Sequence, residues 1–341
     1  MTRMPQALIG KEAIFQALTQ WPLETLLARA DAMRAKVKGP SVLLRAIIEF
    51  SNHCVRNCMY CGLQRVNSKI ERYRMRPEQI VEVACAAAAA GIGTVVLQSG
   101  EDLEYPAEAV AGLVSEIKAR AEVKVTLSLG ERPAEDYALW RRAGADRYLM
   151  KHETANPELY AAMHPGMDLK GRLDSLRLLK SLGYEIGSGF IVGLPGQTLE
   201  TLAADVGLTQ ELGADMCGVG PFVPQADTPL AKTAPGDVET TLKMIALLRL
   251  ACPEANIPAT TALASLAPGD GQRRALEAGA NVIMPNFTPE NFRKNYQIYD
   301  NKTPVGLQTA KDAVSEAKRE LVVDGGLKSP CKTHPKDSDC T

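Results

Sequence analysis

The chain has 341 residues, of which 45% are hydrophobic and 23% are charged, and its formal net charge is -1. A chain of this size buries a large core, either as two ordinary domains or as one large α/β barrel. Because acidic and basic residues are interleaved, we expect no nucleic-acid or anionic-membrane surface, and the expected partners are small molecules or another protein. No segment approaches the roughly 20 apolar residues of a membrane span, and the first ten residues lack a signal-peptide core, which predicts a cytoplasmic protein.

Short apolar runs alternate with helical patterns after an amphipathic start at 11–38. The predicted strands are 46–50, 94–98, 123–129, 147–151, 185–192, 216–219, 258–261 and 281–284. The predicted helices are 77–90, 106–120, 133–143, 157–163, 171–182, 199–212, 238–251 and 271–278, several of which open with proline and end at glycine. This alternation favours a single closed (β/α)8 barrel of the TIM type over an open sheet.

The sequence divides into three parts around this barrel. We expect an N-terminal helical extension at 1–40, the barrel at 41–310, and a C-terminal helix with a short, flexible polar tail at 311–341. In a barrel of parallel strands the carboxyl ends of all strands meet at one mouth, where active sites form. Polar and glycine residues follow most of the predicted strands, so this mouth is the predicted active site.

Three cysteines, Cys54, Cys58 and Cys61, follow the first predicted strand in a single short loop. Three thiolates can hold three irons of a 4Fe-4S cluster and leave the fourth iron open for chemistry. A structural zinc site is the weaker alternative, since the only nearby fourth ligand is His53, too close to Cys54 to complete a tetrahedron easily. The other cysteines do not form a secreted disulfide framework, and a cluster with an open iron agrees with a reducing compartment.

The CxxxCxxC spacing, with Tyr60 before the last cysteine, resembles the radical S-adenosylmethionine (SAM) enzymes. The resemblance implies that SAM binds the open iron. Ser99 and Glu101 flank a glycine in an element similar to the one that meets the methionine amine in that family, although such a glycine is often a simple turn. Tyr60 is either a core aromatic residue or a cover for the adenine, and the family position favours the adenine.

Charged residues on the later strands suggest an anionic substrate. Glu153 and Arg172 are either a structural ion pair or ligands of the SAM ribose and carboxylate. Arg147 and Lys151 are four residues apart on one predicted strand, so they point the same way, and two cations on an inner wall are costly unless they meet an anion. Further hydroxyl donors for such an anion are Thr260, Thr261, Tyr296 and Tyr299.

Longer motifs extend the resemblance over roughly residues 40–300. Segments 47–52, 71–75, 96–102, 126–131, 152–157, 193–198, 257–262 and 281–286 resemble the HydE family, the radical SAM maturases of FeFe-hydrogenase. The resemblance implies one 4Fe-4S cluster on Cys54, Cys58 and Cys61. It also implies SAM surrounded by Gln98, Ser99, Glu153 and Arg172 with Met284 near the adenosyl group, and an anion cavity lined by Arg147, Lys151, Thr260, Thr261, Tyr296 and Tyr299.

The implied reaction is reductive cleavage of SAM to a 5'-deoxyadenosyl radical. This radical attacks the sulfur of a cysteine-bound iron carbonyl-cyanide precursor during assembly of the diiron subcluster and its dithiolate bridge. Transient contacts with other hydrogenase maturation proteins and with an electron donor are expected. Two departures stand out: only Cys331 and Cys340 follow the barrel, so we expect no second cluster, and residue 151 is lysine where arginine is expected.

Two other interpretations stay open at this point. The first is a related radical SAM enzyme of the methylornithine synthase or biotin synthase type, in which the radical abstracts hydrogen from carbon. Its distinguishing feature is an amino-acid or dethiobiotin pocket in place of Arg147, Lys151 and the paired threonines. The second is a non-catalytic iron-sulfur carrier that passes a precursor to an assembly partner.

Overall fold

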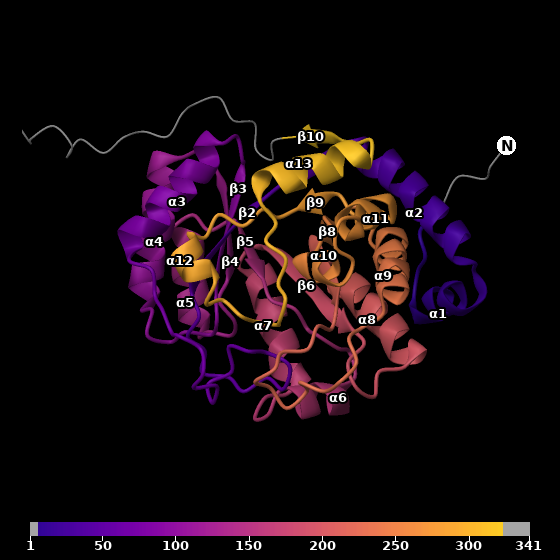
Figure 1. Ribbon diagram of the computed structural model, residues 1–341, viewed down its shortest axis with the longest axis horizontal. Coiled ribbons are helices and arrows are strands. Elements are labelled where there is room, and N and C mark those ends of the chain that lie inside the picture. The colour runs from indigo at the N-terminus through magenta and orange to yellow at the C-terminus, as the bar shows by residue number, and fades with distance from the viewer. Residues whose placement is uncertain (1–5, 323–341) are drawn as a thin grey trace, which may run out of the picture.

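The computed structural model describes residues 6–322 and has the chain coiled into a barrel of parallel strands surrounded by helices (Figure 1). Its strands are β1 (Ser41–Leu44), β2 (Ala46–Ser51), β3 (Thr94–Ser99), β4 (Lys124–Ser128), β5 (Arg147–Leu149), β6 (Glu185–Val192), β7 (Met216–Pro221), β8 (Pro258–Ala259), β9 (Val282–Ile283) and β10 (Glu320–Val322). Cys331 and Cys340 lie outside the described residues.

The strands form two parallel sheets that together close the barrel. One sheet has the order β2-β3-β4-β5-β6-β7, and the other has the order β10-β1-β9-β8. Single parallel bridges join them, from Met216 to Asn256 on one side and from Ile47 to Asn286 on the other. Strands β2 to β9 therefore run once around the barrel, which confirms the predicted (β/α)8 architecture.

Helices cover the outside of the barrel, as Figure 1 shows. They are α1 (Lys11–Gln20), α2 (Leu23–Lys38), α3 (Pro77–Ala89), α4 (Ala107–Arg120), α5 (Ala134–Arg142), α6 (Pro157–Met163), α7 (Leu169–Ser181), α8 (Leu199–Glu211), α9 (Val238–Ala251), α10 (Thr261–Leu266), α11 (Gly271–Glu277), α12 (Glu290–Arg293) and α13 (Leu307–Glu316). The N-terminal helices extend this layer, because α1 packs on α8 and α2 packs on α9. No helix among residues 6–322 is long and apolar enough to cross a bilayer.

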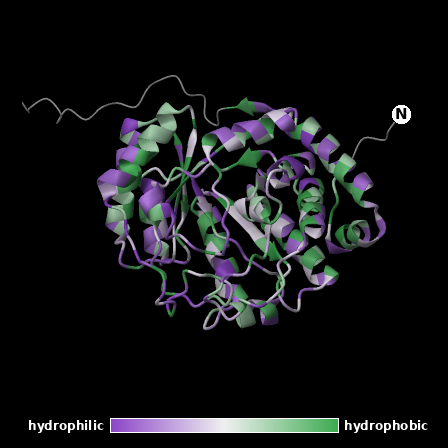
Figure 2. Cartoon of the chain, viewed as in Figure 1, coloured by the Kyte–Doolittle hydropathy of each residue, from purple (hydrophilic) through white to green (hydrophobic). Residues whose placement is uncertain are grey.

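Local sequence signals explain where these elements begin. The side chains of Asn156, Asp168 and Asp237 each accept a hydrogen bond from a backbone N–H in the first turn of the helix that follows. Strands such as β3 are apolar on both faces because helices cover one face and the barrel interior the other. Figure 2 shows the result, with hydrophobic residues concentrated on the strands and hydrophilic residues frequent on the outer helices.

The structure differs from the predicted elements near the C-terminal end. Thr261 begins α10 instead of ending β8, because the Thr260 hydroxyl caps that helix by accepting from the Leu263 N–H (3.4 Å). β1 and β10, which pair in parallel beside β9, were not predicted from the sequence.

A long connection, which we call the strap (residues 287–305), runs from the end of β9 towards α13 and crosses the mouth of the barrel. Several hydrogen bonds hold it there, and three of them join it to the loops at the mouth. The Gly62 N–H donates to the Ile298 carbonyl (3.0 Å), the Asp300 N–H donates to the Pro224 carbonyl (3.1 Å), and the Thr303 N–H donates to the Ser265 hydroxyl (2.9 Å). The strap therefore ties the cysteine loop to the loops after β7 and β8.

Candidate active site

The cysteine loop follows β2 and borders a cavity of about 400 Å³ inside the barrel. Cys54, Cys58 and Cys61 all line this cavity. The Cys54 sulfur accepts hydrogen bonds from the backbone N–H groups of Arg56 and Glu101, both at 3.4 Å. Such bonds stabilise a sulfur that carries negative charge, as it does in a cluster ligand.

The three thiols suit a cationic iron-sulfur centre. Burial raises the pKa of Cys61 to about 12, with the neighbouring Cys54 adding to the rise, and burial also raises the pKa of Cys54 and of Cys58. Bound iron would supply the positive charge that favours the thiolates. Within residues 6–322, no three His, Cys, Asp or Glu side chains lie close enough together to hold a single metal ion.

Gly100 allows the cysteine loop to approach the end of β3. A Cβ atom at this position would lie 2.2 Å from the His53 carbonyl oxygen and 2.8 Å from the Cys54 Cβ. Real Cβ atoms do not come so close to backbone atoms, so any larger residue would displace the loop. Gly100, which the sequence placed in an element similar to the one that meets the methionine amine, is therefore needed to position Cys54.

The structure brings most of the predicted site residues together around this one cavity. The predicted SAM-binding residues that line it are Tyr60, Gln98, Ser99, Glu153 and Met284. The predicted anion-binding residues that line it are Lys151, Thr260, Thr261, Tyr296 and Tyr299. Since the two groups share one space with the three cysteines, a cofactor and a substrate bound there would be in contact.

Three predicted site residues do not line the cavity. Arg147 lies at the start of β5 and donates to Glu185 Oε2 (2.6 Å) and to the Thr94 hydroxyl (3.0 Å). The predicted strand 147–151 is shorter in the structure, where β5 ends at Leu149 and Lys151 lies beyond it. Four residues of extended chain span about 13 Å, so the two cations lie at different heights in the barrel.

Glu101 and Arg172 border the site from behind. The Glu101 carboxylate is buried and accepts from Arg56 Nε (2.8 Å), while Arg172 Nε lies 2.8 Å from Glu131 Oε1. Glu153 pairs with Lys151 (3.0 Å) and not with Arg172. The simple Glu153–Arg172 ion pair considered from the sequence is therefore not formed.

Arg45 was not predicted as a site residue, and Glu131 was predicted only as part of a segment that follows a strand end. Arg45 is 3% exposed and lines the cavity, where its Nη1 lies 2.9 Å from the Met216 sulfur. Glu131 pairs with Arg172, and burial raises its pKa. The position of Glu131 directly after a strand was a usable signal in the sequence. No signal in the sequence indicated that the Arg45 side chain lines the cavity.

The polar neighbour of Tyr60 was also not predicted. The Tyr60 hydroxyl lies 2.8 Å from His164 Nε2, and His164 stacks on Tyr160 with ring centroids 4.2 Å apart. Burial lowers the pKa of His164 to about 4, so this ring is neutral near pH 7 and can accept the Tyr60 proton in a hydrogen bond. The pair fixes Tyr60 at the edge of the cavity.

A buried polar cluster supports the turn that carries Glu153. Glu153 itself has a left-handed backbone (φ 62°), which is uncommon for a residue with a side chain. Behind it, the fully buried Asp205 of α8 accepts from the Ala155 N–H and from Gln197 Nε2 (3.2 Å). Gln197 in turn accepts from the Gly193 N–H (2.7 Å). One carboxylate therefore anchors the turns after β5 and β6, both of which face the mouth.

Comparisons with known proteins agree with this geometry. The model of the radical SAM superfamily matches residues 48–208. The [FeFe] hydrogenase maturase subunit HydE of Thermotoga maritima is 52% identical over 279 residues, which cover 82% of this chain and 80% of that protein. The 3-methylornithine synthase of Methanosarcina acetivorans is 31% identical, with 84% of this chain and 81% of that protein covered.

Solved structures show the same fold. The crystal structure of methylornithine synthase (PylB) matches with a TM-score of 0.82 and 26% identity over 92% of this chain and 94% of that one. The maturase HydG from Carboxydothermus hydrogenoformans matches with a TM-score of 0.76 at 18% identity, covering 92% and 76%, and shows the fold alone. The superfamily implies a 4Fe-4S cluster and SAM. The chain therefore belongs to the radical SAM enzymes, in the group that includes HydE.

Proposed function

We propose that this protein cleaves SAM reductively and uses the resulting radical in the maturation of the FeFe-hydrogenase active site. The observation that carries the proposal is the position of the three cysteines at the edge of a cavity that Lys151, Thr260 and Thr261 also line. The 52% identity to a hydrogenase maturase subunit gives the reaction its biological setting.

The residues divide into three roles in this proposal. Cys54, Cys58 and Cys61 would hold three irons of the cluster, and the fourth iron would be open to the amine and carboxylate of SAM. Tyr60, Gln98, Ser99, Glu153 and Met284 contact SAM, while Glu101 and Arg172 act from behind the cavity wall. The substrate is a small organometallic anion, for which Lys151 and Arg45 supply cations and Thr260, Thr261, Tyr296 and Tyr299 supply hydroxyls.

When bound, the cluster supplies one electron to SAM, which divides into methionine and a 5'-deoxyadenosyl radical. The cavity residues would hold the sulfur of a cysteine-bound iron carbonyl-cyanide precursor beside C5' of SAM, so that a C5'–S bond would form and the unpaired electron would stay on the iron–sulfur unit of that substrate. The chain's own residues orient the two reactants and exclude water. Transient partners are an electron donor and other maturation proteins.

The reaction of the methylornithine synthase type is the nearest alternative, given the 31% identity to such an enzyme. It requires hydrogen abstraction from carbon and releases free 5'-deoxyadenosine. Lys151, Thr260 and Thr261 in the cavity support an anionic substrate instead, although Arg147 does not line the cavity and Lys151 also pairs with Glu153 (3.0 Å). Mass spectrometry separates the two reactions, because only attack on sulfur leaves the adenosyl group covalently attached to the product.

The variant Cys58→Ala tests the cluster assignment. We expect anaerobically reconstituted Cys58→Ala to lose the cluster and, with dithionite and SAM, to form no 5'-deoxyadenosine. Cys85→Ala is the matched control, since Cys85 is buried in α3 away from the cavity, and it should keep both. 5'-Deoxyadenosine formation by Cys58→Ala at the wild-type rate would refute the assignment, and its absence from the wild type would indicate a non-catalytic carrier.

A further inference from the structure

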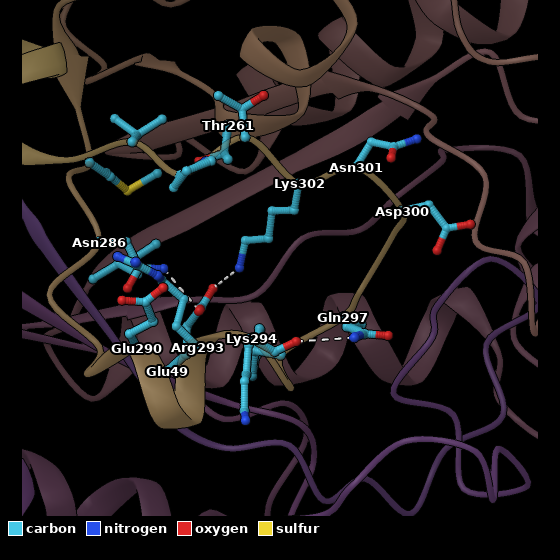
Figure 3. A pocket seen from close by; sticks show the side chains of 16 residues that line it. Glu49, Thr261, Asn286, Glu290, Arg293, Lys294, Gln297, Asp300, Asn301 and Lys302 are labelled. Atoms are coloured by element: carbon cyan, nitrogen blue, oxygen red, sulfur yellow. Dashed lines mark hydrogen bonds and ion pairs between the residues drawn. The ribbon is translucent and has the colours of Figure 1, made fainter.

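A second hollow lies on the other side of the barrel wall, and we call it the outer pocket (Figure 3). Its volume is about 520 Å³, and it is formed by the ends of β2 and β9, by α12 and by the strap. Ile47, Thr261, Met284 and Tyr296 line both the outer pocket and the cavity. The two spaces are therefore separated by a single layer of side chains.

A buried ion pair lines the outer pocket beside this wall. Glu49 is 2% exposed, and its carboxylate accepts from Asn286 Nδ2 (2.9 Å) and contacts Lys302 Nζ. Lys302 Nζ also lies 4.9 Å from the centroid of the Tyr296 ring. Figure 3 shows Lys302 reaching from the strap toward Glu49 across the pocket. The charges of this pair are thus already satisfied by each other.

Two further charges at the outer pocket are not satisfied in this way. Glu290 and Arg293 are three residues apart on α12, so they lie on the same side of that turn. Within residues 6–322, neither side chain forms a hydrogen bond or an ion pair. In Figure 3 both lie beside Glu49 and Asn286, whereas Lys294 points away from them. The pocket therefore presents one carboxylate and one guanidinium that are available to a ligand.

We propose that the outer pocket binds the α-amino-acid group of a small molecule that passes to or from the cavity. Its carboxylate would lie on the guanidinium of Arg293, which suits a two-oxygen acceptor, and its ammonium on Glu290. A plain anion would face the carboxylates of Glu49, Glu290 and Asp300, and a plain cation would face Arg293 and Lys302. A zwitterion finds a partner for each of its charges.

The meaning of this site rests on the proposed function, which includes two species that carry an α-amino-acid group. One is the methionine released when SAM is cleaved, and the other is the cysteine that holds the iron precursor. Both must cross the boundary of the cavity. A molecule in the outer pocket is one layer of side chains from the cavity, on a side that none of the three cysteines lines.

Calorimetric titration of the cluster-loaded protein tests the proposal. Saturating SAM occupies the cluster, so that added methionine cannot take its place there. L-Methionine and S-methyl-L-cysteine represent the two sources. N-acetyl-S-methyl-L-cysteine lacks the ammonium, and 2-(methylthio)ethylamine lacks the carboxylate. We expect binding of at least one of the two amino acids, and a loss of about tenfold or more in affinity when either charge is absent.

Variants locate the site. Arg293→Met and Glu290→Gln should each weaken binding by about tenfold. Lys311→Met, on the exposed side of α13, is the control and should not change it. Binding of methionine alone indicates product exit, binding of S-methylcysteine alone indicates substrate entry, and binding of both indicates recognition of the shared group; each result supports the site.

Absence of binding, or binding that ignores both variants and both analogues, would overturn the proposal. If a variant does not fold, the affinities of the two analogues for the wild-type protein still show whether both charges of the amino acid are recognised. 5'-Deoxyadenosine formation is measured in the same samples, so failure of the proposed function is seen separately.

Discussion

Asp205 offers a test of the electrostatics of the buried polar cluster that supports the Glu153 turn. Its carboxyl is fully buried on α8, where it accepts from the Ala155 N–H and from Gln197. Burial raises the pKa of Asp205 from its usual 3.8 to about 7, although the hydrogen bonds it accepts oppose the rise. The variant Asp205→Asn keeps the size of the side chain and removes its titration.

The expected magnitude follows from linkage. Because the folded protein holds this proton more tightly than the unfolded chain, the stabilisation is fully present below pH 3.8 and is lost as the pH rises to about 7. One pKa unit corresponds to about 1.4 kcal/mol. Between about pH 8 and about pH 5.5, the wild type should therefore gain about 2 kcal/mol in the free energy of unfolding relative to Asp205→Asn.

Urea unfolding of both proteins across this pH range measures the difference. Cluster-free protein under anaerobic, reducing conditions keeps cluster loss out of the comparison. Asp312→Asn, on the exposed side of α13, serves as the control and should show the pH dependence of the wild type. A wild-type advantage that stays constant or shrinks on acidification would mean that Asp205 is already ionised at about pH 5.5, and the reasoning would be wrong.

Two further substitutions probe the cysteine loop and the barrel wall. Gly100→Ala should abolish most iron binding on reconstitution, because the new Cβ would collide with the loop at Cys54. The control is Gly112→Ala on α4, where a Cβ would meet nothing within 4 Å and should add about 0.5–1 kcal/mol to the free energy of unfolding. Equal iron content in the two variants would contradict this reasoning. Lys302→Met should lower the free energy of unfolding in urea by about 3 kcal/mol, because it leaves the buried Glu49 without its cation. Lys302→Arg should keep most of the wild-type stability. A loss below about 1 kcal/mol in Lys302→Met would show that the pair is not buried in solution.

The barrel was predictable from the sequence because each strand is buried on both faces. Runs such as 95–97 and 186–192 are apolar or small throughout and stand between helices with recognisable starts, so their order and parallel pairing follow from alternation alone. The cysteine loop was predictable for a different reason, since the short spacing of Cys54, Cys58 and Cys61 directly indicates three thiolate ligands in one loop.

The sequence did not indicate how far along the barrel axis each side chain lies, or which side chains contact one another across the barrel. Period-two alternation predicts on which side of a strand Arg147 and Lys151 lie, but only the register with neighbouring strands tells which of them reaches the cavity. The contact between Tyr60 and His164 joins residues 104 positions apart and has no local signature. The same holds for Asp205, which reads as an ordinary helix residue until its burial is known.

The bridge between Met216 and Asn256 has a consequence for how this part of the barrel wall is held together. Above this bridge, no further backbone pairing joins β7 to β8 among the described residues, and β7 carries Gly218 and Gly220 at that height. Among the described residues, every other pair of neighbouring barrel strands is joined by a parallel ladder, or by a bridge that continues one, as the Ile47–Asn286 bridge continues the β1–β9 ladder. β7 stays tied to β6 on its other side by a ladder that pairs Gly187–Val192 with Met216–Pro221. Above the bridge, side-chain packing therefore takes the place of main-chain pairing at this junction of the barrel wall.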